Sequence, residues 1–167
     1  MTTEEFILLF GSSGHVRAAL NWSRLTDKQF HVQHRFHTSP DRLGQMNTLW
    51  YTGPDGTPVE YTHPQAAPLT TRQASKTDMR SLPQRENTLT RLTKQASGSL
   101  EPVQLVLPAY RLPNGTDLIL DGTHRAVAAL RAQARVTVFL YVLLGPADPT
   151  ILPDLAHYCA EDRSGAD

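Results

Sequence analysis

The sequence predicts an α+β fold with a β-rich N-terminal half, and three segments carry most of this prediction. Residues 30–37 (FHVQHRFH) alternate in polarity with a period of two, which indicates a half-buried strand. Residues 136–144 (VTVFLYVLL) form a continuous apolar run rich in β-branched and aromatic side chains, which is typical of a central strand. Residues 123–134 place apolar side chains at helical spacing, so we expect a helix with one buried face.

The rest of the N-terminal half adds three expected elements. The apolar run FILLF at residues 6–10 predicts a short strand, followed by a glycine- and serine-rich turn and a helix from about His15 to Leu25. Residues 47–62 contain two β-prone runs around Gly-Pro-Asp-Gly, which predicts a hairpin. We therefore read residues 1–61 as one β-rich part of the chain.

Residues 62–83 are polar, contain three prolines and show no period, so we expect a long loop or lid there. Residues 84–144 then predict a regular series: a helix over about 85–96, a buried strand, a Pro-Asn-Gly turn, a second strand, the 123–134 helix and the last strand. We expect one short helix in the tail and fraying at 161–167. The whole of residues 1–160 would form a single domain.

Composition and charge limit the functions that this chain can have. Its 167 residues suffice for one domain with a core, and no apolar run approaches the roughly 18 residues of a membrane span. Glu4 and Glu5 have the wrong sign for a secretory signal, so we expect a cytoplasmic protein. The formal net charge of zero argues against a nucleic-acid partner. The single cysteine, Cys159, excludes a disulfide framework and a cysteine-based zinc site.

Two segments resemble binding motifs but fit them poorly. Gly11 and Gly14 flank a turn before the expected helix, yet the spacing is not G-x-G-x-x-G, so we interpret it as a turn in which Ser12 or Ser13 caps the helix. His31, His34 and His37 invite a metal site, but on a strand His34 points away from the other two.

The strongest candidate site is Asp121-Gly122-Thr123-His124-Arg125, between an expected strand and an expected helix. Asp121 and Thr123 can each cap a helix, but two cations in a first turn oppose the helix dipole unless an anion lies there. Backbone N–H groups at a helix N-terminus suit phosphate oxygens, and an arginine adds bidentate charge-assisted bonds. The motif therefore predicts a phosphate-binding site.

Glu86 is a further candidate, at the start of the expected 85–96 helix. An acidic residue in the first turn is favoured by the helix dipole alone, so its chemistry in isolation does not require a function.

The run from Glu86 to Leu144 resembles the ParB/sulfiredoxin superfamily, whose members carry Asp-Gly-x-His-Arg or a variant between a strand and an alanine-rich helix. The resemblance implies a mixed sheet with flanking helices. Sulfiredoxins place a cysteine immediately before His-Arg, where this chain has Thr123, and chromosome-partitioning members use a different loop. The free-serine kinases of this fold are the most similar in the motif. Their glutamate base precedes the first strand, and Glu86 has a similar context.

The leading hypothesis is a phosphotransferase that uses ATP or ADP with Mg²⁺ and acts on the hydroxyl of a small metabolite, such as serine or a related amino acid. Gly122, Thr123, His124 and Arg125 would bind the phosphates, Asp121 would orient His124 or hold the metal, and Glu86 would be the base. Two alternatives remain open: a nucleotide-binding regulatory or partner module without chemistry, and a nucleic-acid processing enzyme of the same superfamily. Arg72, Lys76 and Arg80 would lie on a lid formed by residues 62–83.

Overall fold

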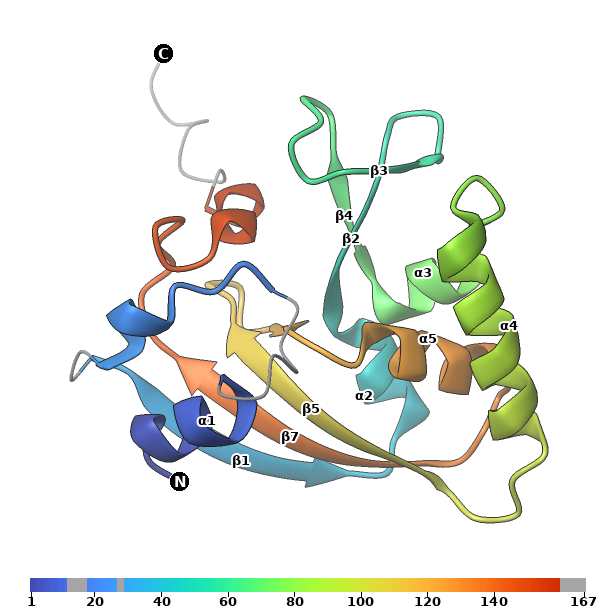
Figure 1. Ribbon diagram of the computed structural model, residues 1–167, viewed down its shortest axis with the longest axis horizontal. Coiled ribbons are helices and arrows are strands. Elements are labelled where there is room, and N and C mark those ends of the chain that lie inside the picture. The colour runs from blue at the N-terminus through green and yellow to red at the C-terminus, as the bar shows by residue number, and fades with distance from the viewer. Residues whose placement is uncertain (12–17, 27–28, 160–167) are drawn as a thin grey trace.

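The computed structural model describes residues 1–11, 18–26 and 29–159, and its strands form one mixed sheet of seven strands (Figure 1). The order is β1-β7-β5-β6-β2-β3, and β4 also pairs with β2. The β5–β7 and β2–β6 pairs are parallel and the other pairs are antiparallel, which confirms the α+β class. The strands are β1 (His31–His37), β2 (Asn47–Thr52), β3 (Pro58–Val59), β4 (Ala67–Thr70), β5 (Val103–Arg111), β6 (Asp117–Ile119) and β7 (Val136–Leu144).

Helices cover both faces of this sheet. The α-helices are α1 (Thr3–Phe10), α2 (Pro40–Gln45), α3 (Thr71–Lys76), α4 (Pro83–Ser97) and α5 (Thr123–Arg131), and two 3-10 helices, η1 (Trp22–Thr26) and η2 (Pro153–His157), complete the set among the described residues. Alternate residues of a strand face opposite sides. Accordingly Leu105 and Leu107 of β5 pack with α5, whereas Tyr110 packs with Phe6 and Phe10 of α1.

The expected order of elements in residues 84–144 is confirmed. Helix α4 leads to β5, and β5 forms a hairpin with β6 in which the Leu112 backbone N–H donates to the Thr116 carbonyl at 2.9 Å. Helix α5 follows, and β7 then returns parallel to β5, between β1 and β5 in the sheet. Because the β6–α5 junction carries the Asp121–Arg125 motif, this part of the fold positions the candidate site.

The strand expected at residues 6–10 is wrong, because this segment belongs to helix α1. The Thr2 side chain accepts a hydrogen bond from the Glu5 backbone N–H at 3.2 Å, and the Glu5 carboxylate accepts one from the Thr2 N–H at 2.7 Å. This capping box satisfies two N–H groups that a helix start otherwise leaves unpaired. Phe6 and Phe10, four residues apart, then lie on one face and are buried.

The helix expected from about His15 to Leu25 is also not found as such. Residues 12–17 lie outside the described part of the chain, residues 18–21 are not helical, and only the 3-10 helix η1 follows at Trp22–Thr26. Leu25 of η1 is fully buried in the cluster that contains Phe6. Tertiary packing of a short turn therefore replaces the regular helix.

The reading of residues 62–83 as an unstructured loop is wrong, because the segment contains β4 and α3. Strand β4 pairs with β2, and α3 begins with a second capping box between Thr70 and Gln73. Thr71, Ala74 and Met79 are completely buried. Burial of these side chains explains why the segment is ordered into elements despite its prolines and polar composition.

The remaining expectations for the N-terminal half are mostly confirmed. Strand β1 and the β2–β3 hairpin occur where expected, with the Gly53 N–H donating to the Thr57 carbonyl across the turn. The half is less β-rich than expected, since it also holds α1 and α2.

The short tail helix is η2, while residues 161–167 lie outside the described residues. Among described residues, the helices are too short or too polar to cross a membrane.

Candidate functional site

The candidate site begins at Gly122, which is the N-cap of α5 and has left-handed backbone angles of φ +88° and ψ 8°. A Cβ at this position would come within 2.5 Å of the Leu107 side chain, so both the backbone angle and the space require glycine. The N-cap makes no side-chain hydrogen bond, so the sequence expectation that Asp121 or Thr123 caps α5 is wrong. The N-cap of α5 therefore contributes no side-chain hydrogen bond to the first turn, and the N-terminus of a helix favours an anion.

A cavity of about 990 Å³ lies beside this helix start, and arginines dominate its charge. Arg85 and Arg91 of α4 and Arg125 of α5 line it, and among the described residues that line it Asp121 is the one carboxylate. Three guanidinium groups against one carboxylate leave two positive charges in excess. A concave surface with this excess of fixed donors suits phosphate groups. The cavity is also lined by Leu82, Pro83, Gln84, Thr88, Gly122 and His124.

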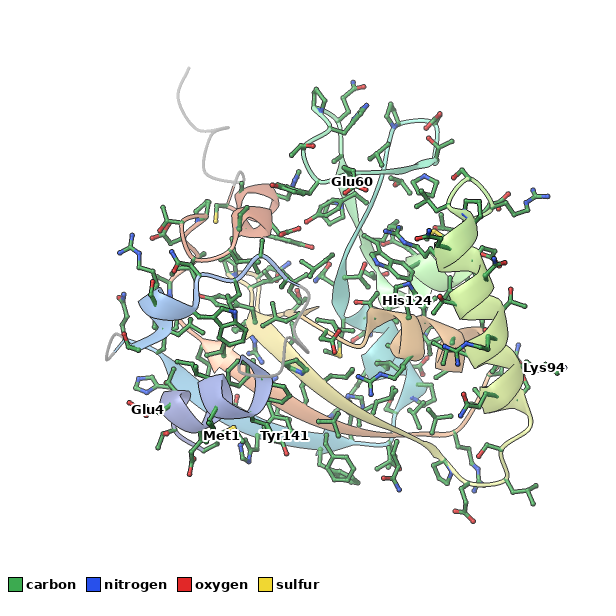
Figure 2. The ribbon with its side chains drawn as sticks, viewed as in Figure 1. Met1, Glu4, Glu60, Lys94, His124 and Tyr141 are labelled. Atoms are coloured by element: carbon green, nitrogen blue, oxygen red, sulfur yellow. The ribbon has the colours of Figure 1, made fainter. Side chains whose placement is uncertain are left out.

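Trp50 of β2 connects the two sides of this cavity. The His124 ring packs edge-on against the Trp50 indole, with the ring centroids 4.8 Å apart. The Arg85 guanidinium carbon lies over the same indole, 4.5 Å from its centroid. Burial lowers the pKa of Arg85, while the charge of Glu60 opposes this effect. Figure 2 shows His124 at the start of α5, close to α4. The nearly buried indole thus contacts one side chain from each helix, His124 of α5 and Arg85 of α4.

Asp121 and Arg125 form an ion pair across one helical turn, with 3.7 Å between Oδ2 and Nη2. The Arg125 side chain keeps 47% of its surface exposed, so it remains accessible to a ligand. The donors of this cavity fit phosphate well but do not build a metal cage, because the described part of the chain contributes one carboxylate, Asp121, to its lining. Within the described residues, no cluster of three or more His, Cys, Asp or Glu side chains is placed to hold a metal ion. A magnesium ion would therefore have to arrive with the nucleotide phosphates, which is its usual mode of binding.

Glu86 lies apart from the other predicted site residues. Its carboxylate accepts hydrogen bonds from Arg131 Nη1 at 2.9 and 3.2 Å, at the C-terminal end of α5. Eight residues separate Thr123 from Arg131, which at 1.5 Å per residue is about 12 Å along the helix. Arg131 also donates to the backbone carbonyls of Ser75 and Thr77. The Glu86–Arg131 pair therefore links α4 to α5, and Arg131 extends the link to α3; Glu86 is not among the residues that line the cavity.

The basic residues expected on a lid have other partners. Arg72 pairs with Asp41 at 2.7 Å and Arg80 pairs with Asp78 at 2.6 Å. Because α3 packs against α5 through buried side chains, residues 62–83 form part of the folded body beside the cavity. The expectation that residues 62–83 form a lid over the site is therefore wrong, because α3 of this segment is packed against α5.

The three histidines of β1 do not converge, because alternation separates them. His34 packs against Tyr141 with the ring centroids 4.7 Å apart, on the face that carries α1. His37 lies on the opposite face and lines a separate cavity of about 450 Å³ with Arg42. Burial, and then the charge of Arg42, lower the pKa of His37, while a backbone hydrogen bond at Ser39 and the charge of Asp117 oppose this.

Asp117 is the acidic centre of this second charged region. Its carboxylate accepts hydrogen bonds from Arg35 at 3.2 Å and from Arg111 at 2.7 Å, and its side chain is 11% exposed. The group links β1, β5 and β6 on the face that carries α2. Since the carboxylate already has two arginine partners, we interpret this group as a structural ion network.

Comparisons of the chain with models of known protein families, with curated proteins and with solved structures gave no significant match. The resemblance of residues 86–144 to the ParB/sulfiredoxin superfamily therefore stays a prediction. The Gly11–Gly14 turn lies largely outside the described residues.

Arg85, Arg91 and Trp50 are the site residues that sequence reasoning missed. A partial signal exists in α4, where Gln84, Thr88 and Arg91 recur at helical spacing and so share one side of the helix. That spacing does not reveal that this side faces the start of α5. The positions become meaningful only when α4 is packed against α5.

Proposed function

We propose that the protein binds the phosphates of ATP or ADP in the arginine-lined cavity and transfers the terminal phosphoryl group to the hydroxyl of a small metabolite. The observation that carries this proposal is the convergence of Arg85, Arg91 and Arg125 on one cavity at the N-terminus of α5. Helix N-termini and guanidinium groups are the two donors that proteins use most directly for phosphate.

The proposed chemistry depends mainly on electrostatics. The transition state of phosphoryl transfer spreads negative charge over the phosphoryl oxygens, and preorganised cations stabilise that charge. Arg125 and Arg91 would supply these cations, with His124 as a further donor. Mg²⁺ would arrive bound to the nucleotide phosphates and would neutralise further phosphate charge there.

The position of Glu86 changes the proposed assignment of the base. Glu86 is not among the residues that line the cavity, whereas Asp121 is, so Asp121 takes the role of proton acceptor in our proposal. The same observation favours a second candidate function, a nucleotide-binding module without chemistry. In that case Glu86 is purely structural and no group transfer follows binding.

Nucleotide binding is tested by calorimetric titration with Mg·ATP and Mg·ADP. We expect Arg91→Ala and Arg125→Ala each to weaken binding by about tenfold or more, since a hydrogen bond to a charged group contributes about 1.5–3 kcal/mol. Lys94→Ala is the matched control, because Lys94 is a cation of α4, like Arg91, but does not line the cavity. Equal affinity in all four proteins would refute the phosphate site.

Transfer is tested separately by following phosphate from the nucleotide by ³¹P nuclear magnetic resonance. We expect Asp121→Asn to abolish turnover and Glu86→Gln to retain it. Retained binding of nucleotide with no new phosphate ester in the wild type would support the module without chemistry. Loss of turnover in Glu86→Gln with normal folding would restore Glu86 as the base.

A further inference from the structure

Strand β1 lies at an edge of the sheet, and its outer side has no partner strand among the described residues (Figure 1). An unpaired edge strand presents a row of backbone N–H and C=O groups, and proteins commonly protect such strands with prolines or charged side chains. Residues 31–37 contain no proline, lysine, aspartate or glutamate. Their one arginine, Arg35, already forms an ion pair with Asp117 at 3.2 Å. This edge is therefore open to a further strand.

The sheet face that carries α1 ends in an exposed apolar patch. The Phe36 ring packs against Phe139 of β7 with the centroids 5.4 Å apart, yet the two residues are 60% and 39% exposed. Val106, opposite Phe139 on β5, is 43% exposed. Helix α1 reaches only as far as Tyr141, two residues farther along β7, against which Phe10 packs. Contiguous exposed side chains of this kind mark an interaction site.

The residues of β1 form a palindrome of chemical types around His34. Positions equally far from His34 carry two histidines, two apolar side chains and two polar side chains: His31 with His37, Val32 with Phe36, and Gln33 with Arg35. A two-fold interface uses the same surface of both subunits, so a strand must match its own reverse to form one. Two antiparallel copies of β1 with the two-fold axis at His34 would place every residue opposite its counterpart.

Each cross-strand pair in this arrangement is chemically compatible. Arg35 already donates to the Gln33 amide oxygen within one chain, at 2.7 and 3.1 Å, and the same donor and acceptor would face each other across the axis. A neutral imidazole has one donor and one acceptor nitrogen, so two histidines can pair. Burial and the charge of Arg42 lower the pKa of His37, which keeps that ring neutral at pH 7. No pair brings two permanent charges together.

The arrangement also gives the exposed Phe36 ring a place to pack. Its counterpart is Val32, which lines a hollow of about 400 Å³ beside the N-terminus of α1. Met1, Thr3 and Phe30 are among the other residues that line this hollow. Side chains directly opposite each other on paired strands have Cβ atoms about 4.5–5.5 Å apart, so the ring of one copy would reach the hollow of the other. The two-fold axis makes this contact twice.

We propose that the protein forms a homodimer in which the β1 strands of two copies pair antiparallel about His34 and join the two sheets into one. A second copy is the occupant that the palindrome selects, because an unrelated strand would impose no such symmetry on β1. The arginine-lined cavity and β1 have no residue in common, so this inference does not rest on the proposed function.

Sedimentation velocity over a range of protein concentrations measures the assembly, and we expect twice the mass of one chain. Phe36→Lys should raise the Kd of the dimer at least about tenfold, because it removes a buried ring and adds two charges to the interface. Leu100→Lys is the matched control, since Leu100 is an apolar residue outside β1 that is 89% exposed, and its Kd should be unchanged. A monomer at every concentration would overturn the inference, as would a dimer that Phe36→Lys leaves intact.

Disulfide cross-linking in a Cys159→Ser background tests the register of the two strands. In the proposed pairing the two Cα atoms of residue 34 lie about 4.5–5.5 Å apart, which a disulfide can bridge. His34→Cys should therefore give a covalent dimer under mild oxidation. His31→Cys is the matched control, because the two copies of residue 31 lie six residues out of register, or about 20 Å apart, and should not cross-link. Cross-linking at neither position, or equally at both, would refute the pairing about His34.

Discussion

Replacing Gly122 by alanine should destabilise the protein strongly, because two independent costs coincide at this residue. Its φ of +88° is left-handed, which costs a residue with a Cβ about 1–2 kcal/mol. The added Cβ would also lie 2.5 Å from Cδ2 of Leu107 and 3.1 Å from Nη2 of Arg125. Leu107 is completely buried, so it cannot move aside freely, and overpacking of a core costs about 1–3 kcal/mol. We expect a total loss of about 2–5 kcal/mol in the free energy of unfolding.

Urea denaturation followed by circular dichroism measures this loss, and Gly56→Ala is the matched control. Gly56 has a similar φ of +79°, but no atom lies within 4 Å of its built Cβ. The control should therefore show the backbone cost alone, about 1–2 kcal/mol. The difference between the two variants isolates the clash with Leu107. If Gly122→Ala loses no more stability than Gly56→Ala, the close packing of the α5 start against β5 is refuted.

Three further predictions concern charged side chains away from Gly122. Glu86→Gln should lower the free energy of unfolding by about 1–2 kcal/mol, since it weakens the pair with Arg131, which is partly exposed; an unchanged urea midpoint would contradict this. Asp117→Asn should cost about 2–3 kcal/mol because two arginine partners lose their carboxylate, with some of the effect screened by solvent, and thermal unfolding would detect it. The lowered pKa of His37 means that the unfolded chain binds this proton more readily, so stability is full above about pH 6.5 and falls as the pH drops below it. His37→Asn should reduce the stability loss between pH 7 and pH 5, and an identical pH profile would exclude this source.

Hydrophobic periodicity was sufficient to predict the C-terminal half of the fold. The continuous apolar run of β7 and the Pro-Asn-Gly turn before β6 are local signals, and the structure has both elements where these signals occur. The Asp121–Arg125 motif was likewise predicted at the start of a helix. The structure adds that Gly122, not Asp121 or Thr123, is the N-cap.

The N-terminal errors have local and tertiary causes. FILLF was read as a strand from its apolar run, although Thr2 and Glu5 have the spacing of a capping box that predicts a helix. In residues 62–83 the capping pair of Thr70 and Gln73 was a comparable signal. The pairing of β4 with β2 could not be read locally, because it depends on a partner strand about twenty residues away.

The partner of Glu86 shows the limit of sequence reasoning about the site. Arg131 follows it by 45 residues, and nothing in either local pattern indicates that they meet. A glutamate in the first turn of a helix can stabilise the helix dipole, act as a catalytic base or form an ion pair, and its sequence context does not distinguish these roles. Only the packing of α4 against α5 selects the ion pair, and the same packing brings Arg85 and Arg91 to the start of α5.

The contacts of Trp50 give the protein an internal optical reporter. The chain has two tryptophans, and Trp22 packs beside Phe6 in a core cluster that does not include Trp50. A Trp22→Phe protein would emit from Trp50 alone, whose indole touches one side chain from each wall of the arginine-lined cavity, His124 and Arg85. Any anion that draws His124 or Arg85 toward itself alters the electric field across that indole. The emission spectrum would therefore report occupancy of the cavity directly, without a label and before any chemistry takes place.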